Sequence, residues 1–212
     1  MAVDNIAEKI IDSSESTKIV RIGHPARILE SVLPRCLDAL IANYNNRRGN
    51  RRGRTRVAQY SNTQNIGIPS EEIKSLVLKN AQIIFCTNVA AGGDVIINML
   101  KDADRTAFDL VIIDECAQAT EPACWIPIQF AKKVVLAGDH MQLAPLIKSD
   151  KAAKQGLSDT MFEQLIKNRP ELVKMLRIQH RMNEKIMFWS SECMYKGELV
   201  AAPDVADQLL ED

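Results

Sequence analysis

Residues 108–119 read FDLVIIDECAQA, a short apolar run followed by two adjacent carboxylates, Asp114 and Glu115. The run is too short for a typical helix, and a continuous apolar stretch of this length is typical of a parallel strand buried on both faces. Open α/β sheets bind their ligands at the carboxyl ends of such strands. The stretch therefore predicts a buried strand that delivers two carboxylates to a ligand site. Taken alone, it is equally consistent with a chance acidic pair after a core strand.

Similar apolar runs, separated by stretches of helical periodicity, recur along the chain. They predict further strands at residues 17–23, 82–87, 133–138 and 173–177. Apolar spacing or helix-start signals predict helices at residues 2–12, 25–42, 70–79, 158–167 and 183–195. Strands that alternate with helices indicate an α/β fold, a parallel sheet flanked by helical crossovers.

The composition excludes several classes of protein. The chain has 212 residues, with 27 basic and 27 acidic side chains and a formal net charge of zero, which argues against a basic nucleic-acid coat or an acidic tail. Because no apolar run reaches about 18 residues, we expect no membrane association. The five cysteines include no Cys-x-x-Cys pair, so neither a disulfide framework nor a structural metal is expected.

The polar stretch at residues 43–67 differs from the rest of the chain. Within it, residues 47–56 read RRGNRRGRTR and hold six arginines, including Arg51 and Arg52. The composition fits a solvated, disordered surface loop. It also fits an arginine–glycine arm that holds nucleic-acid phosphates by charge, and composition does not separate the two interpretations.

A second strand-and-turn motif occupies residues 133–145, KVVLAGDHMQLAP. An apolar run ends at Gly138 and Asp139, and Gln142 follows three residues later. A glycine permits a tight turn at the end of a strand. The amide of Gln142 both donates and accepts hydrogen bonds, so it could contact a phosphate oxygen and a water together.

A third motif occupies residues 176–186, LRIQHRMNEKI, and contains Gln179, His180 and Arg181. A guanidinium group stays charged and matches phosphate oxygens with its fork of donors. In isolation, Arg181 is equally well explained as a surface arginine at the start of a helix.

These three motifs, in this order and each after a predicted strand, resemble the superfamily 1 helicases. The resemblance is to the group that contains senataxin and the immunoglobulin mu-binding-protein helicase, and the latter is the nearer of the two. It also covers AVDN at 2–5, RIGHPARILES at 21–31, CTN at 86–88 and MYKGEL at 194–199. It implies RecA-like domains: residues 1–172 would be part of the first, with residues 43–67 as a disordered insertion, and residues 173–212 would begin the second.

The resemblance also implies an activity, which is ATP hydrolysis coupled to 5′-to-3′ movement along a nucleic-acid strand. ATP and Mg²⁺ would be the cofactors. Asp114 would hold Mg²⁺ through water, Glu115 would activate the attacking water, Gln142 would sense the γ-phosphate and Arg181 would reach the phosphates. Gly138, Asp139, Gln179 and His180 would line the nucleotide site, and His180 stands where the family usually has a tyrosine near the adenine.

Single-stranded DNA or RNA is the implied partner. Asp4, Asn5, Thr87 and Asn88 match family segments that lie along the nucleic-acid backbone, and Arg51 and Arg52 would add charge. A monomer in the nucleus and cytoplasm is the corresponding expectation.

Some motifs of the family have no counterpart in the sequence. A phosphate-binding loop of the pattern G-x-x-x-x-G-K-[S/T] is absent, as are the late motifs of the second domain. We therefore expect an internal part of a larger helicase that does not hydrolyse ATP at a useful rate alone. The alternatives are a non-catalytic module that binds nucleic acid through the arginine-rich stretch, and a degenerate product without function.

Overall fold

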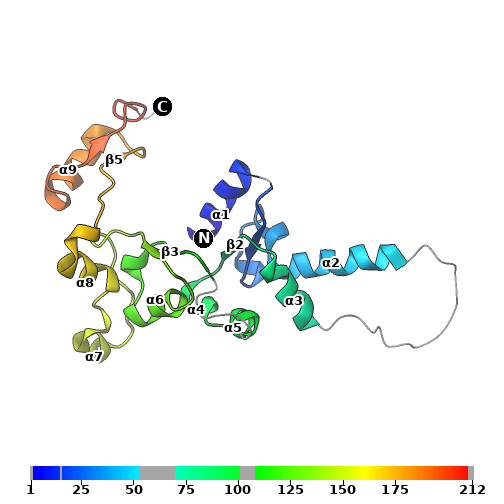
Figure 1. The fold of residues 1–212 in the computed structure, drawn as a ribbon. Helices are drawn as coiled ribbons and strands as arrows, with labels where there is room; N and C mark the ends of the chain where they lie inside the picture. The colour runs from blue at the N-terminus through cyan, green and yellow to red at the C-terminus, as the bar shows by residue number, and fades with distance from the viewer. Residues whose placement is uncertain (1, 15, 53–69, 101–107, 210–212) are drawn as a thin grey trace.

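The computed structural model describes residues 2–14, 16–52, 70–100 and 108–209, and its elements form a mixed α/β arrangement (Figure 1). The first elements are α1 (Ala2–Ser13), β1 (Ile19–Arg21), α2 (Leu37–Arg52), α3 (Ser70–Lys79) and β2 (Ile83–Phe85), with two 3-10 turns, η1 (Pro25–Arg27) and η2 (Leu33–Arg35), between β1 and α2. The predicted strands at 17–23 and 82–87 and the predicted helices at 2–12 and 70–79 are confirmed.

The elements that follow contain the Asp-Glu motif at residues 108–119 and the Gly-Asp motif at residues 133–145. They are α4 (Asn88–Ala91), α5 (Asp94–Leu100), β3 (Val111–Ile113), η3 (Cys116–Gln118), α6 (Glu121–Ile128) and β4 (Val134–Leu136). After them come α7 (Asp150–Ala152), η4 (Ala153–Leu157), α8 (Met161–Asn168) and η5 (Pro170–Leu172). The strands predicted at 108–114 and 133–138 thus form, and a helix forms within the predicted range 158–167.

The last described residues form a small C-terminal lobe, which we define as residues 178–209. It contains β5 (Ile178–Gln179), α9 (Glu184–Met194) and β6 (Val200–Ala201). Figure 1 shows this lobe, in orange and red, beyond α8 at the end of an extended connection. Residues of that connection are exposed, including Leu176 at 89%. We call residues 2–172 the main body.

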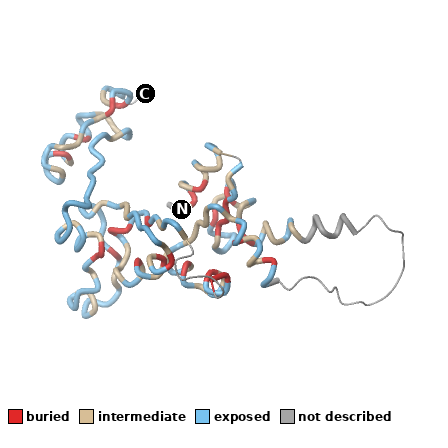
Figure 2. The backbone as a smooth tube through the Cα atoms, viewed as in Figure 1, coloured by how far each residue is buried: buried red, intermediate tan, exposed pale blue. Residues whose placement is uncertain are grey.

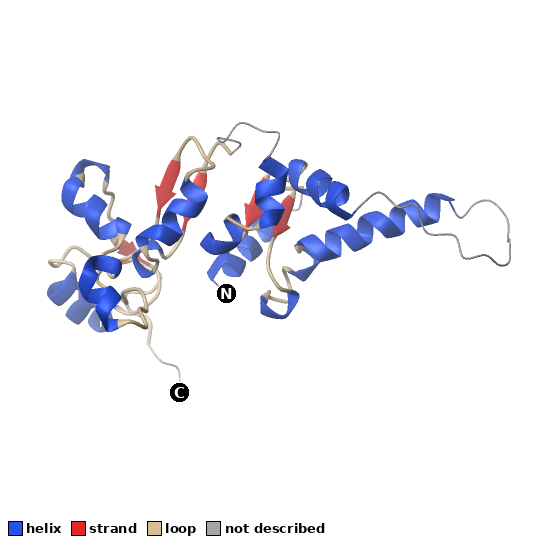
Figure 3. Cartoon of the chain, turned by 90° about the horizontal axis from the view of Figure 1, so that it is seen from below, coloured by secondary structure: helices blue, strands red, loops and turns tan. Residues whose placement is uncertain are grey.

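The three strand pairs in the described part of the chain are parallel, as the continuous apolar runs predict. β1 pairs with β2, β3 pairs with β4, and β5 pairs with β6. Within the described ranges these are three separate two-stranded sheets and not one continuous sheet, and the separation of the first two is visible in Figure 3. Ile112, Val134 and Val135 consequently keep large exposed fractions, 62%, 37% and 48%.

Buried side chains gather in several small clusters instead of one large core (Figure 2). The largest surrounds β1 and consists of Val20, Leu37, Leu78, Ile96, Met99, Leu100 and Phe130. Because Phe130 comes from the segment between α6 and β4, this cluster joins that segment to β1, α2, α3 and α5. Helix α4 also packs against α6, where an added Cβ on Gly92 would lie 2.8 Å from Cγ2 of Ile126.

The predicted helix at residues 25–42 is wrong. The chain forms the two 3-10 turns η1 and η2, and α2 begins only at Leu37. Pro34 explains the interruption, because proline lacks the N–H of an interior helical residue and disfavours helical geometry in the residue before it. The apolar residues of this stretch are still used, since Ile28 and Val32 lie buried against Ala7 and Cys36.

Two further predictions need correction. The strand predicted at 173–177 does not form; pairing begins at Ile178, and the preceding residues are exposed. The disordered loop predicted from residue 43 is wrong as far as residue 52, because α2 continues to Arg52. Arginine is a good helix former, which accounts for this continuation. The rest of that predicted loop, residues 53–67, lies outside the described residues.

Over the ranges that the structure describes, none of the helices has the length and apolar character that crossing a bilayer requires.

Candidate nucleotide site at the ends of two parallel strands

Asp114 and Glu115 lie directly after β3 and are exposed, whereas Ile113 before them is buried at 3% exposure. Glu115 adopts left-handed backbone geometry, with φ of 53° and ψ of 34°. This conformation costs a non-glycine residue about 1–2 kcal/mol. It turns the chain sharply into η3, where the Gln118 amide donates a 2.8 Å hydrogen bond to Oε2 of Glu115.

The end of β4 runs beside this turn. The backbone N–H of Ala137 donates to the carbonyl of Ile113 at 2.8 Å, and the N–H of Cys116 donates to the carbonyl of Ala137 at 2.9 Å. Gly138 then passes so close that a Cβ there would lie 2.9 Å from the backbone N of Ala117. Only a residue without a side chain permits this approach, which brings the two acidic motifs to one edge.

Asp139 organises the loop after β4. Its Oδ1 accepts a 3.0 Å hydrogen bond from the backbone N–H of Met141, and its Oδ2 accepts a 2.8 Å bond from the amide of Gln142. The same Oδ2 accepts a 2.6 Å bond from the hydroxyl of Tyr195, at the end of α9. Partial burial alone would raise the pKa of Asp139, but these three donors outweigh it and hold the pKa below its usual value of 3.8.

Buried thiols underlie the turn after β3. Burial, reinforced by the neighbouring Cys124, raises the pKa of Cys116 to about 12, and the carboxylates of Asp114 and Glu115 add to the effect. Cys124 is likewise buried, and burial raises its pKa. Both thiols therefore stay protonated at neutral pH and serve as packing groups rather than nucleophiles.

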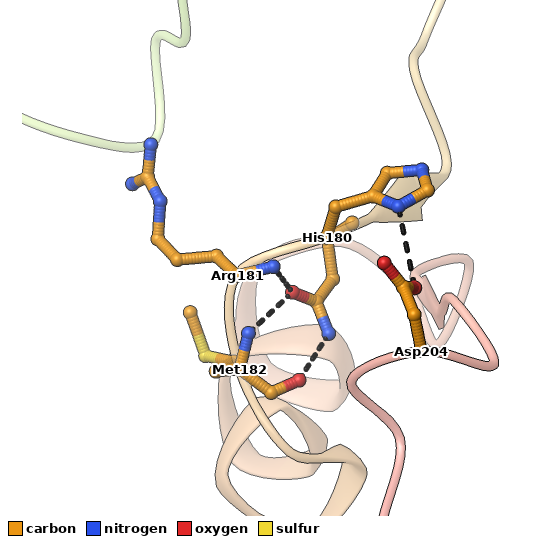
Figure 4. Close-up of polar contacts among 5 residues, drawn as sticks. His180, Arg181, Met182 and Asp204 are labelled. Carbon is orange, nitrogen blue, oxygen red and sulfur yellow. Dashed lines mark hydrogen bonds and ion pairs between the residues drawn. The ribbon is translucent and has the colours of Figure 1, made fainter. Parts of the chain in front are cut away.

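The Gln-His-Arg motif forms the turn between β5 and α9 (Figure 4). The carbonyl oxygen of the Gln179 side chain accepts from the backbone N–H groups of Arg181 and Met182, at 2.8 and 2.9 Å, and its amide donates to the Met182 carbonyl at 2.6 Å. His180 lies 3.4 Å from Asp204. Gln179 is thus occupied in shaping the turn.

Arg181 is exposed and projects away from the Gln179 turn in Figure 4. Among the residues that the structure describes, its guanidinium makes no hydrogen bond or ion pair. A cation held by a shaped turn and without a protein partner is available to an anionic ligand.

The residues matched to nucleic-acid motifs have different surroundings. Asp4 is fully buried and pairs with Arg21 at 2.6 Å, so its contact in this conformation is structural. Asn5 is exposed. Thr87 caps α4 just after β2 by accepting a 3.3 Å hydrogen bond from the Ala90 N–H, and Asn88 begins that helix. The side chains of Arg51 and Arg52, in the last turn of α2, lie outside the described part.

The structure therefore brings Asp114, Glu115, Gly138, Asp139 and Gln142 to one edge. Gln179, His180 and Arg181 belong to the C-terminal lobe, which reaches this edge through Tyr195. Sequence reasoning missed the roles of Tyr195 and Gln118. The spacing of Gln118, three residues after Glu115, was a usable signal, because residues three apart share a face of a 3-10 turn. No local pattern connects Tyr195 with Asp139, 56 residues away.

Comparison with known proteins places this chain in a family. A family model described as an AAA domain matches residues 43–150, about half of the chain, and a second AAA domain model matches residues 157–212. These domains have the RecA-like fold of P-loop NTPases, which confirms the fold class expected from the sequence. The border between the two matches lies before the predicted one at residue 172, which stays a prediction.

Several relatives align with the whole chain. The DNA-binding protein SMUBP-2 of Rattus norvegicus is 39% identical over 234 residues, which cover 100% of this chain and 23% of the rat protein. The DNA polymerase alpha-associated DNA helicase A of Schizosaccharomyces pombe is 36% identical, covering 100% of this chain and 33% of that protein. The chain thus spans about a quarter to a third of the length of these relatives. It belongs to the AAA domain family, within the superfamily 1 helicase group that its motifs resemble.

Proposed function

We propose that the chain forms part of the motor of an ATP-dependent helicase that moves 5′-to-3′ on single-stranded DNA or RNA. The observation that carries the proposal is the parallel pairing of β3 with β4. It places the Asp-Glu pair and the Gly-Asp-x-x-Gln loop at the same carboxyl edge, where α/β sheets bind their ligands. Family membership and the name of the Schizosaccharomyces pombe relative, a DNA helicase, support the same activity.

Mg²⁺ and a nucleoside triphosphate fit the exposed side chains at this edge. Mg²⁺ takes oxygen ligands and keeps several waters, so a single exposed carboxylate such as Asp114 suffices on the protein side. When bound, the ion would neutralise phosphate charge. Glu115 would accept the proton of the attacking water, with Gln118 orienting its carboxylate. Gln142 would contact the terminal phosphate, and Arg181 would add positive charge to it.

Nucleic acid would bind near the carboxyl ends of β1 and β2. Thr87 and Asn88 lie there, immediately after β2, and both have polar side chains that suit contacts to phosphate and sugar oxygens. Arg51 and Arg52 would add electrostatic attraction. The same resemblance leads us to propose a monomer that works in the nucleus and the cytoplasm.

A second function is favoured by one sequence observation. Without a G-x-x-x-x-G-K-[S/T] stretch, the chain has no backbone cradle for the β- and γ-phosphates. We therefore propose that the chain alone turns over ATP at no useful rate. In that case its own activity could be non-catalytic binding of RNA or DNA through the arginine-rich stretch.

One set of measurements distinguishes the two functions. Binding of a fluorescent single-stranded oligonucleotide is followed by anisotropy, with and without Mg²⁺ and a non-hydrolysable ATP analogue, for wild type, Gln142→Ala and Arg181→Ala. Nucleotide-dependent binding that both variants lose supports the motor. Binding that depends on salt but not on nucleotide supports the second function. ATP turnover that Glu115→Gln abolishes would overturn the proposed inactivity of the chain alone.

A further inference from the structure

The carboxylate of Asp139 is shared between two parts of the molecule. Its Oδ2 accepts one hydrogen bond from Gln142, in the same loop, at 2.8 Å and another from Tyr195, in the C-terminal lobe, at 2.6 Å. Both donors therefore meet at one oxygen atom. The orientation of the Gln142 amide therefore depends on the Asp139 carboxylate. The position of that carboxylate is set partly by Tyr195, which belongs to the C-terminal lobe.

The tyrosine contact exists only while the lobe is docked. The lobe follows an extended connection whose residues are exposed. Figure 1 shows this connection running between α8 and the lobe without a helix or strand of the described residues beside it. Over the described ranges, the bond between Tyr195 and Asp139 is the one side-chain hydrogen bond that joins residues 174–209 to residues 2–172. Separation of the lobe would therefore break it without disturbing the strand pairs.

The electrostatics of the three side chains agree with this geometry. Burial, together with the hydrogen bond to Asp139, raises the pKa of Tyr195, while the neighbouring Gln142 amide opposes the rise. The hydroxyl is thus protonated at neutral pH and acts as a donor, and the carboxylate of Asp139 is ionised and acts as an acceptor. A hydrogen bond to an ionised acceptor is stronger than one between neutral groups.

We propose that Tyr195 is a positioning residue for Gln142. Its hydroxyl fixes Asp139, and Asp139 fixes the amide, so the phosphate-sensing side chain is held in place only when the C-terminal lobe is docked. The inference rests on the proposed function for the role of Gln142 toward a nucleotide. The physical coupling of Tyr195, Asp139 and Gln142 does not require that function.

The coupling is tested by NMR spectra of the side-chain amides of the ¹⁵N-labelled chain, with the Gln142 signal assigned by its loss in Gln142→Ala. We expect Tyr195→Phe to shift this signal and Tyr44→Phe, a matched loss of a hydroxyl on α2, to leave it unchanged. In an Asp139→Asn background, Tyr195→Phe should add no further shift. The proposal would be overturned if Tyr195→Phe left the Gln142 signal unchanged. It would also be overturned if Tyr195→Phe shifted this signal in the Asp139→Asn background as much as in the wild-type chain.

A second measurement separates this inference from the proposed function. Each variant is titrated with Mg²⁺ and a fluorescent ATP analogue. We expect Tyr195→Phe to weaken binding about tenfold, as for loss of one hydrogen bond to a charged group, and Tyr44→Phe to have no effect. If the wild-type chain binds no nucleotide, the proposed function fails for this chain, while the amide signal still decides the role of Tyr195. Nucleotide binding that Tyr195→Phe leaves intact would overturn the positioning role.

Discussion

Asp4 on α1 and Arg21 on β1 form a 2.6 Å ion pair in which the side chains are 0% and 6% exposed. Arg21 also donates a hydrogen bond to the carbonyl of Ile22. Burial by itself would raise the pKa of Asp4, but Arg21 outweighs burial and lowers it. The pair joins the N-terminal helix to the first strand at the point where the strand ends.

We predict that Asp4→Asn destabilises the chain by about 3–5 kcal/mol, because it leaves the buried Arg21 charge uncompensated. The measurement is the free energy of unfolding in urea. The matched control is Asp109→Asn, which removes an exposed carboxylate 3.3 Å from Lys132 and should change little. Equal losses in both variants would contradict a special role for the buried pair.

Gly138→Ala should lower stability by about 1–3 kcal/mol. The new methyl group would lie 2.9 Å from the backbone N of Ala117, so the ends of β3 and β4 would have to move apart. Thermal unfolding measures the loss. In Gly93→Ala the new Cβ would lie 3.2 Å from the carbonyl oxygen of Ala90, so this variant should lose less stability. If the two variants unfold at the same temperature, the close approach at Gly138 makes no special contribution to stability.

Glu115→Gly should stabilise the chain by about 0.5–1 kcal/mol, because glycine adopts left-handed geometry without strain while only an exposed hydrogen bond to Gln118 is lost. Asp114→Gly is the control; its φ is not positive, so the same substitution there should destabilise. Denaturant midpoints decide the matter. Such strain at a candidate catalytic residue fits a site where stability is given up for function.

Thiol reactivity should separate the cysteines by burial. We expect rapid reaction of the exposed Cys193 with a disulfide reagent at pH 8, and very slow reaction of the buried Cys116, whose pKa is about 12. Cys193→Ser should remove the fast phase, and Cys124→Ser should retain it. A fast phase that survives in Cys193→Ser and disappears when Cys116→Ser is added would show that the folded chain opens at the turn after β3.

The contact between Asp139 and Tyr195 should hold over a wide pH range. The pKa of Asp139 is lowered from 3.8, so its contribution is present above that pH and is lost as the pH falls through the lowered value. The pKa of Tyr195 is raised from 10.0, so its contribution is present below that pH and is lost as the pH rises through the raised value. Alkaline titration of tyrosine absorbance checks this prediction: Tyr195→Phe should remove a component that ionises above pH 10.0.

Sequence periodicity predicted the strands of the main body because buried parallel strands leave a strong local signal. It failed where local and distant effects compete. Pro34 interrupts a stretch with helical apolar spacing, and the apolar residues before β5 lie in an exposed connection. The placement of Asp114 and Gln142 at one edge followed from strand order. The contact of Tyr195 with Asp139 depends on how the lobe docks, which no pattern within either segment encodes.

The parallel pairing of β1 with β2 has a consequence for synthesis of the protein. Ile19 aligns with Ile83, so the partner of the first strand lies 83 − 19 = 64 residues further along the chain. A growing polypeptide must carry an unsatisfied apolar segment until that partner has left the ribosome, and pairings so distant in sequence form slowly. How many chains fold correctly would then depend on the rate of this distant pairing as well as on thermodynamic stability.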